Sequence, residues 1–320
     1  MQVDQAAGLR KLVDRLSGEG GLVAAAPCAH VHCSSAARLP DDLEWHPPIR
    51  EQRKQRLRAI AITSGKGGVG KTNLAVNLAI VLSRMGHRTM ILDGDLGLAN
   101  VDVLLGIRPR HNLRHVVDGT KSIEQIIVEG PENVKILPGG SGLYDMANLD
   151  EHQARALQES AAELNGLADI LLVDTAAGIS ANVINLILAA DEILVVASPE
   201  PTSIADAYGL IKAVVGKSRQ LCFKLVLNMV AGPAEAKEAA QRIILAANRF
   251  LDVEVEDCGM ILSDSNVPKA VRAQVPFLLA YPKTPASVGV LALGRRLLSY
   301  RDVTEERRGF DSFFNRLVSR

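Results

Sequence analysis

Five apolar runs separated by turn residues organise most of the chain. They lie at residues 57–63, 89–93, 170–174, 193–197 and 221–229. Turn residues and then apolar residues at helical spacing follow each run, and this pattern continues to about residue 300. Strands that are apolar on both sides are typical of parallel sheets with helices on both faces. We therefore predict an α/β domain over residues 57–300, built as a doubly wound and mostly parallel sheet.

The two ends of the chain have different patterns. Residues 4–16 predict a short amphipathic helix with Asp4 as its N-cap. Its apolar positions are Leu9, Leu12, Val13 and Leu16. Residues 17–56 mix glycine, alanine, serine, proline and charged residues without a period, which predicts a flexible linker. With a further amphipathic helix over residues 305–320, the chain divides into a leader (1–16), a linker, the α/β domain and a C-terminal helix.

Composition narrows the function classes. The 320 residues hold 36 Lys+Arg and 36 Asp+Glu, so the net charge is zero. A protein whose main partner is a specific nucleic acid usually has an excess of basic residues, and we therefore expect no such partner. Four cysteines are too few for a disulfide framework, which favours a reducing cytosol. Charged residues within the first 20 positions exclude a signal-peptide core there, and no apolar stretch reaches the roughly 18 residues of a membrane span. We expect a cytoplasmic protein that is at most peripherally associated with a membrane.

A phosphate-binding loop follows the first apolar run. Residues 64–72 read Ser-Gly-Lys-Gly-Gly-Val-Gly-Lys-Thr, which fits the pattern G-x-x-x-x-G-K-[ST] between a predicted strand and a predicted helix. Lys71 is expected to reach the β- and γ-phosphates, and the Thr72 hydroxyl to ligate Mg²⁺. Backbone N–H groups of the loop would converge on the β-phosphate, at Gly65, Gly67, Gly68, Val69 and Gly70.

Aspartates end two of the predicted strands. Asp93 and Asp95 follow one apolar run, and Asp174 ends another. A carboxylate at the C-terminal end of a parallel strand faces the ligand crevice of the sheet. Asp174 is therefore expected to hold Mg²⁺ through a water molecule, as a Walker B aspartate does. A helix cap is the alternative for an isolated strand-end aspartate, and the neighbouring phosphate loop favours the metal site.

A second lysine, Lys66, lies inside the loop. The form K-G-G-x-G-K-[ST] resembles the deviant Walker A loop of the MinD/ParA family of ATPases, which also includes nitrogenase iron protein. The resemblance covers about residues 57–300 and implies ATP, Mg²⁺ and a homodimer. In that family the extra lysine reaches the nucleotide of the other subunit, which makes dimerisation and ATP binding depend on each other.

The same resemblance implies roles for further residues. Asp95 matches the aspartate that orients the attacking water, and Asp93 stands behind it as magnesium shell or support. Asn228 matches the asparagine that hydrogen-bonds adenine, and Asp206 a carboxylate that supports the dimer face. This chain departs from the family pattern at Ala176, where glycine is usual, and the change could stiffen the loop that senses the γ-phosphate.

Three stretches resemble the FlhG/FleN branch of the family. Residues 93–106 read Asp-Gly-Asp-Leu-Gly-Leu-Ala-Asn-Val-Asp-Val-Leu-Leu-Gly, and Asn73 follows the loop. The third stretch, residues 4–10, is similar to the D-Q-A-x-x-L-R activator helix of that branch, matched by Asp4, Gln5, Leu9 and Arg10. This resemblance implies stimulation of the GTPase FlhF and control of flagellar number or placement. C-ring proteins or a transcription regulator are further possible partners, and a MinD-type division-site ATPase is the alternative.

The C-terminal helix has an apolar face flanked by arginines. That face consists of Phe310, Phe313, Phe314 and Leu317, at i, i+3, i+4 and i+7. Four arginines and one aspartate within residues 307–320 predict an interfacial helix that faces anionic lipid. The tail of MinD and FlhG is similar, which implies membrane association in the ATP-bound state. A helix that docks its aromatic residues into its own core is the alternative.

Other function classes have weaker support. An iron–sulfur carrier would need cysteines presented to a partner subunit, but Cys222 lies in a predicted buried strand and Cys258 near the start of another. Residues 28–33 offer Cys28, His30, His32 and Cys33, whose tight spacing strains a tetrahedral zinc site. We interpret that run as incidental. The third alternative is an ATP-binding scaffold without hydrolysis, against which Asp95 predicts slow turnover that a partner or lipid stimulates.

Overall fold

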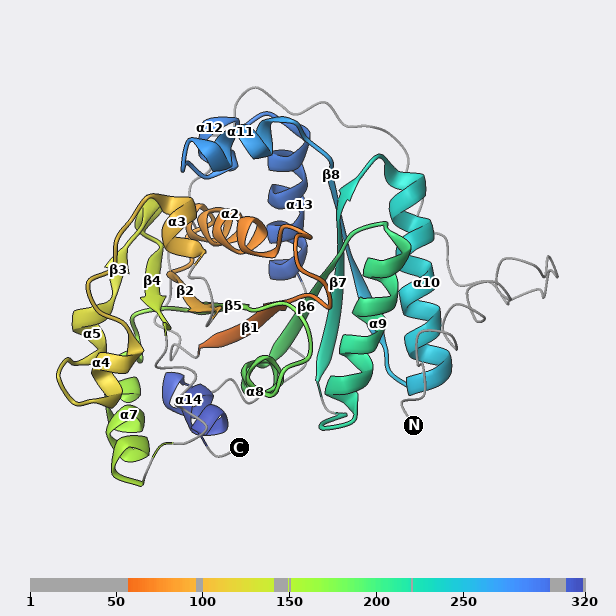
Figure 1. Cartoon of the computed structure of the whole chain (residues 1–320). Coiled ribbons are helices and arrows are strands. Elements are labelled where there is room, and N and C mark those ends of the chain that lie inside the picture. Colours follow the sequence, from red (N-terminus) through yellow and green to blue (C-terminus); the bar gives the residue numbers. More distant parts are fainter. Residues whose placement is uncertain are drawn as a thin grey trace. The chain divides into compact units, whose positions relative to one another are not determined.

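The computed structural model describes residues 57–95, 100–140, 149, 151–219, 221–299 and 309–318 (Figure 1). The predicted leader helix, the linker and the run from Cys28 to Cys33 lie outside these residues.

In chain order the elements are β1 (Arg58–Thr63), α2 (Lys71–Arg84), β2 (Thr89–Gly94), α3 (Val101–Leu105), α4 (Leu113–Val117), α5 (Ile123–Ile126), β3 (Val128–Glu129), the 3₁₀ turn η1 (Pro131–Asn133), β4 (Lys135–Pro138), α7 (Glu151–Glu163), β5 (Ile170–Thr175), α8 (Ala181–Ala189), β6 (Glu192–Ala197), α9 (Pro201–Val215), β7 (Cys222–Val230), α10 (Pro233–Leu251), β8 (Val255–Leu262), α11 (Asn266–Arg272), α12 (Phe277–Ala280), α13 (Pro285–Ser299) and α14 (Phe310–Val318). Helices and strands alternate from β4 to β8, as the sequence predicts, whereas helices follow one another between β2 and β3 and after β8.

The strands form one eight-stranded sheet in the order β3-β4-β2-β5-β1-β6-β7-β8. All neighbouring strands run parallel except β3 and β4, which pair antiparallel at one edge. Each of the five predicted runs forms a strand, and β1 and β5 at the centre are buried along their whole length. The predicted doubly wound α/β fold is thus confirmed.

Side chains of each strand alternate between two apolar cores. In β1, Ala59 and Ala61 pack with α8, α9 and α14, whereas Ile60 and Ile62 pack with α2 and α13. Figure 1 shows α2 and α13 on one side of the central strands and α8 and α14 on the other. Alternate residues of a strand point to opposite faces, so a strand covered by helices on both faces needs apolar residues at all of its positions.

Helix α13 lies very close to α2. A Cβ atom added at Gly294 of α13 would lie only 2.4 Å from Cγ1 of Val81 in α2. Glycine at position 294 therefore permits a helix contact that any side chain would push apart. The contact lies in the C-terminal half of α2, the helix whose first turn carries Lys71 and Thr72.

Candidate functional site

The phosphate loop connects β1 to α2 at the C-terminal edge of the sheet. Gly68 and Gly70 adopt left-handed backbone conformations, with φ of 82° and 81°. Side chains are strained in this region, so the loop needs glycine at both positions. Gly70 is the N-cap of α2 and brings no side chain, which leaves the first N–H groups of the helix available to an anion.

Neighbouring segments hold the base of the loop in place. A Cβ atom at Gly65 would lie 2.1 Å from the carbonyl oxygen of Asp206 in α9, so this glycine permits a close backbone approach. The Ser64 hydroxyl donates to the Lys66 carbonyl at 2.9 Å, and the Gly178 N–H donates to the Ser64 carbonyl at 2.9 Å. The last contact joins the loop to the segment that follows β5.

Lys71 and Asp174 form a buried ion pair. Nζ of Lys71 lies 2.9 Å from Oδ1 of Asp174, and the two side chains are 8% and 0% exposed. Burial raises the pKa of Asp174, and the positive charge of Lys71 opposes that rise. Within the described part of the chain, Oδ2 of Asp174 is buried without a hydrogen-bond partner. A buried carboxylate oxygen of this kind requires a cation or a hydrogen-bond partner such as water.

Asp93 lies beside Asp174, because the two residues are neighbours in the β2–β5 ladder. Oδ1 of Asp93 accepts from the Asp95 N–H at 3.2 Å, and Oδ2 accepts from the Val101 N–H at 3.3 Å. Burial, and then the negative charge of Asp174, raise the pKa of Asp93 to about 7. Two buried carboxylates that repel each other are a suitable donor set for a divalent cation. The residues present therefore fit Mg²⁺, with Asp174, Asp93 and the hydroxyl of Thr72 in the first turn of α2 as its holders.

Asp95 follows β2 directly at this edge. Its Oδ2 accepts a hydrogen bond from Nδ2 of Asn100 at 3.2 Å, a contact that the sequence alone gave no reason to expect. Residues 96–99 between them lie outside the described chain. The role of Asp95 in orienting water stays a prediction.

The Lys66 side chain contacts residues of its own chain. Nζ lies 2.6 Å from Oε2 of Glu200 and 3.1 Å from Oγ1 of Thr202, both at the start of α9. The lysine side chain is 39% exposed, so this pair is open to solvent. Asp206, one to two turns further along α9, is exposed. Neither the trans role of Lys66 nor the dimer role of Asp206 is tested by these contacts.

A pocket of about 160 Å³ adjoins the loop. Leu74, Ile261 and Phe277 supply apolar wall, and Asn228 and Asp264 supply polar groups. An apolar slot with few polar groups suits a nucleotide base. Gly70 of the phosphate loop is part of its lining.

The carboxamide of Asn228 is already engaged on both sides. Nδ2 donates to the carbonyl of Val69 at 2.8 Å, and Oδ1 accepts from the Met229 N–H at 2.9 Å. A Cβ atom at Gly70 would lie 2.5 Å from Nδ2 of Asn228. Asn228 therefore supports the phosphate loop, and its predicted contact with adenine remains untested.

Comparisons with known proteins agree with this geometry. Residues 57–223 match the family described as AAA domain. The chain is 40% identical to the antiactivator FleN of Pseudomonas aeruginosa, over 82% of this chain and 94% of FleN. It is 33% identical to the flagellum site-determining protein YlxH of Helicobacter pylori, over 83% of this chain and 91% of YlxH.

Solved structures give the same answer. MinD of Pyrococcus horikoshii in complex with Mg-ADP aligns with a TM-score of 0.61 at 26% identity, over 76% of this chain and 96% of MinD. MinD from the MinC:MinD complex of Aquifex aeolicus aligns with a TM-score of 0.60 at 27% identity, over 78% and 99%. The chain belongs to the MinD/ParA family of P-loop ATPases, on its FlhG/FleN branch.

In this FlhG/FleN-type protein the C-terminal helix is docked on its own core. Phe310, Phe313 and Phe314 of α14 are fully buried and Leu317 is 5% exposed. They pack against α7 and α8 within the apolar core on that face of the sheet. This docking is the alternative that the helix pattern left open beside a lipid contact, and membrane association stays a prediction. No helix in the described ranges is long and apolar enough to cross a membrane.

The two cysteines in the described part of the chain, Cys222 and Cys258, do not support an iron–sulfur role, although Cys222 is exposed rather than buried as its strand predicted. Cys258 is buried, and burial raises the pKa of its thiol to about 12. Cys222 is at the exposed start of β7, and burial of part of its side chain raises its pKa as well. Cluster ligands are thiolates, which both environments disfavour.

Sequence reasoning missed the partners of Lys66. Glu200 and Thr202 lie more than 130 positions from Lys66, and only the packing of α9 beside the loop brings them there. A signal was present, since Pro201 opens a helix directly after the apolar run that forms β6. The helix therefore begins at the same edge of the sheet as the phosphate loop.

Proposed function

We propose that this chain is an ATP-driven, dimerising switch that controls flagellar number or placement. The observation that carries the proposal is the buried Lys71–Asp174 pair with its unpartnered oxygen, beside a loop that holds an additional lysine. The Lys71–Asp174 pair suits the binding of a nucleotide with Mg²⁺, and Lys66 suits a contact with the nucleotide of a second subunit. The similarity to FleN and YlxH supports the flagellar role.

Each residue of the site has a distinct task in this proposal. Lys71 and the loop N–H groups bind the β- and γ-phosphates, and Thr72, Asp174 and Asp93 hold Mg²⁺. Mg²⁺ held by these residues would neutralise charge that develops on the transferred phosphoryl group. Asp95 orients the attacking water. Hydrolysis by a single chain is slow, because the positive charge of Lys66 reaches a nucleotide only from the other subunit of the dimer.

Nucleotide state is transmitted through the segment after β5. Its Gly178 N–H contacts Ser64 in the loop, and the segment leads into α8, which begins at Ala181. Helix α14 packs on α8. A γ-phosphate that rearranges residues 176–180 would thus alter the surface on which α14 rests.

Release of α14 would present its apolar face to a membrane. Phe310, Phe313, Phe314 and Leu317 would enter the lipid interface, and the flanking arginines would attract anionic headgroups. A dimer presents two such helices, so avidity makes binding depend on ATP. The protein would therefore be cytoplasmic and associate peripherally with the inner membrane when ATP is bound.

Matched lysine variants test the ATPase part. Lys71→Ala should abolish binding of Mg-ATP, whereas Lys66→Ala should leave binding to the monomer within about twofold and abolish ATP-dependent dimerisation and hydrolysis. Fluorescent ATP titration and sedimentation measure the two properties separately. Loss of nucleotide binding in both variants, or in neither, would contradict the separate roles.

The flagellar part is tested with the full chain and FlhF. GTP hydrolysis by FlhF should rise when the wild-type chain is added, and the Gln5→Ala variant should not raise it. No stimulation at saturating wild-type protein would remove the FlhF role. The ATPase would remain, and a MinD-like placement role would become the leading candidate.

The membrane part is tested by deletion of residues 305–320. Flotation with vesicles that contain anionic lipid should recover the wild type with Mg-ATP and not the deletion variant. Neutral vesicles are the control for the arginines. A deletion variant that still floats would contradict the role of the tail.

A further inference from the structure

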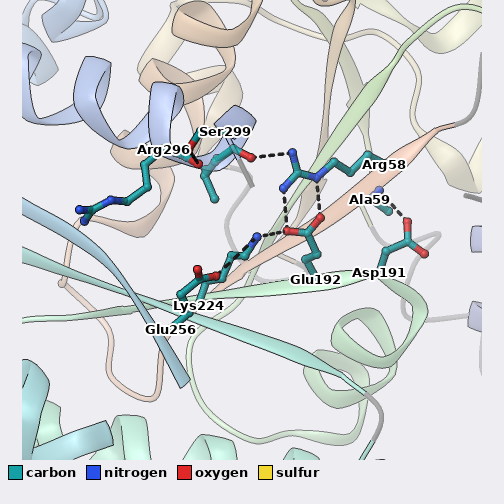
Figure 2. Close-up of polar contacts among 9 residues, drawn as sticks. Arg58, Ala59, Asp191, Glu192, Lys224, Glu256, Arg296 and Ser299 are labelled. Atoms are coloured by element: carbon teal, nitrogen blue, oxygen red, sulfur yellow. Dashed lines mark hydrogen bonds and ion pairs between the residues drawn. The ribbon is translucent and has the colours of Figure 1, made fainter. Parts of the chain in front are cut away.

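Two adjacent residues at the start of β6 contact opposite faces of the sheet. Asp191 precedes the strand and Glu192 is its first residue. Side chains of consecutive strand residues point to opposite faces. Figure 2 shows the result: Glu192 meets Arg58 and Lys224, while the Asp191 carboxylate reaches Ala59.

Glu192 fixes the end of α13. Its Oε1 accepts from Nε of Arg58 at 2.5 Å, and its Oε2 from Nη2 of Arg58 at 2.7 Å and from Nζ of Lys224 at 2.5 Å. The third nitrogen of Arg58, Nη1, donates to the carbonyl of Leu297 in the last turn of α13 at 2.9 Å. The Arg58 and Glu192 side chains are only 7% and 13% exposed.

Asp191 fixes the end of α14. Its Oδ2 accepts from the Ala59 N–H at 2.9 Å, and its Oδ1 accepts from Nη2 of Arg316 at 2.9 Å. Arg316 is in the last turn of α14. The Asp191 and Arg316 side chains are 18% and 22% exposed, so water reaches this pair more easily than the Glu192 pair.

We propose that Asp191 and Glu192 act as a two-sided clasp in which only the Asp191 side opens. Glu192 keeps α13 on the face of the sheet that also carries α2. Asp191, through Arg316, sets the fraction of chains in which α14 leaves the opposite face. Asp191 is thus a positioning residue for the C-terminal helix. The inference rests on the proposed function in one respect, namely that the released helix binds lipid.

The unequal burial of the two sides is the reason for this assignment. Removing one member of a buried, multiply bonded ion pair leaves an uncompensated charge in the interior, which is strongly unfavourable. The Asp191–Arg316 pair is single and less buried, so breaking it costs less than breaking the bonds of Glu192. Asp191 also keeps its contact with Ala59 when Arg316 leaves, so the sheet is not disturbed by the opening.

Hydrogen exchange of the full chain, without nucleotide or lipid, tests the clasp. Asp191→Asn retains an acceptor for the Ala59 N–H and loses the charge that pairs with Arg316. Exchange in residues 310–318 should become about two- to fivefold faster, which is the range for a partly exposed ion pair. Exchange in residues 285–299 should not change.

Two further variants make the test decisive. Arg316→Gln changes α14 and leaves the strands unaltered, and it should accelerate exchange in residues 310–318 by the same factor. The double variant Asp191→Asn/Arg316→Gln should show no further acceleration. Glu192→Gln is the matched control, and it should accelerate exchange in residues 285–299 or across the whole domain. Unchanged exchange in residues 310–318 for both Asp191→Asn and Arg316→Gln would overturn the proposal, as would additive effects in the double variant.

A vesicle measurement separates the clasp from the membrane role. If released α14 binds lipid, Asp191→Asn should raise nucleotide-free binding to vesicles of phosphatidylglycerol and phosphatidylcholine by the same two- to fivefold factor. Faster exchange without increased vesicle binding would support the clasp and contradict the proposed lipid contact. Unchanged exchange together with ATP-dependent vesicle binding by the wild type would support the lipid contact and contradict the clasp.

Discussion

Lys66 is paired with Glu200 of its own chain, at 2.6 Å, although the family resemblance gives Lys66 a role at the nucleotide of a second subunit. The pair is exposed, so it is weak and readily exchanged for another anion. If Lys66 has the proposed role in trans, Glu200 would compete with the partner's nucleotide for the same lysine. Formation of the dimer would then include the cost of breaking this contact.

We predict that Glu200→Gln strengthens ATP-dependent dimerisation, by up to about fivefold in the dissociation constant, because Lys66 no longer leaves an ion pair. Sedimentation with Mg-ATP measures the effect. Glu238→Gln is a matched control, since that glutamate pairs with Arg242 at 2.6 Å on exposed α10. A weaker dimer would show instead that Glu200 is needed across the interface.

Asn228→Ala separates support of the loop from recognition of the base. The bond from Nδ2 to Val69 predicts that affinities for Mg-ATP, Mg-GTP and inorganic triphosphate all fall by the same factor, roughly fivefold for one buried hydrogen bond. Calorimetric titrations with the three ligands provide the comparison. A loss restricted to Mg-ATP would favour the adenine contact that the family resemblance implies.

Phe313 has a fully buried ring in α14 and packs edge to face on Phe314, with ring centroids 5.4 Å apart. Phe313→Ala should reduce the free energy that docks α14 by about 3–5 kcal/mol, as for other buried phenylalanines. Limited proteolysis at the C-terminal end should accelerate accordingly. Val318→Ala, at the partly buried end of the helix, serves as control, and equal cleavage of both variants would argue against tight docking.

Glu192 gives stability a specific pH dependence. Burial alone raises the pKa of Glu192, but its bonds with Arg58 and Lys224 outweigh burial and hold the pKa below the usual 4.5. An acid with a lowered pKa in the folded state stabilises the fold above pH 4.5, and this contribution is lost as the pH falls through the folded-state value.

Glu192→Gln should therefore lower the free energy of unfolding by about 3–5 kcal/mol at pH 7, because Arg58 loses its counter-charge and Lys224 loses its closer one, keeping Glu256 at 4.0 Å. The difference from wild type should shrink in acid. Urea denaturation at pH 7 and well below pH 4.5 tests both statements. A difference that does not vary with pH would mean that the ion pairs contribute little.

The sequence predicted the central strands because their burial on both faces leaves an unbroken apolar run. It did not predict β4, whose four residues begin with Lys135 and end with Pro138, nor the two-residue strand β3. Strands of this length carry too few residues for a period to be recognised. Strand β4 is placed by its pairing with β2, and β3 by its pairing with β4, and no local pattern encodes either pairing.

The candidate site divides in the same way. The loop, Lys71, Asp93 and Asp174 were predicted because each depends on a local motif and on the common edge of parallel strands. The partners Glu200 and Asn100 were not, because only tertiary packing selects them. For α14 the spacing predicted the correct apolar face, but the same face suits lipid and protein core alike.

The contact between Gly294 and Val81 has a mechanical consequence. Only the Val81 side chain separates the two helices at this point, so we expect α13 to follow any tilt of α2. A tilt that nucleotide binding causes at the first turn of α2 would therefore reach α13, on the face of the sheet opposite α8 and α14.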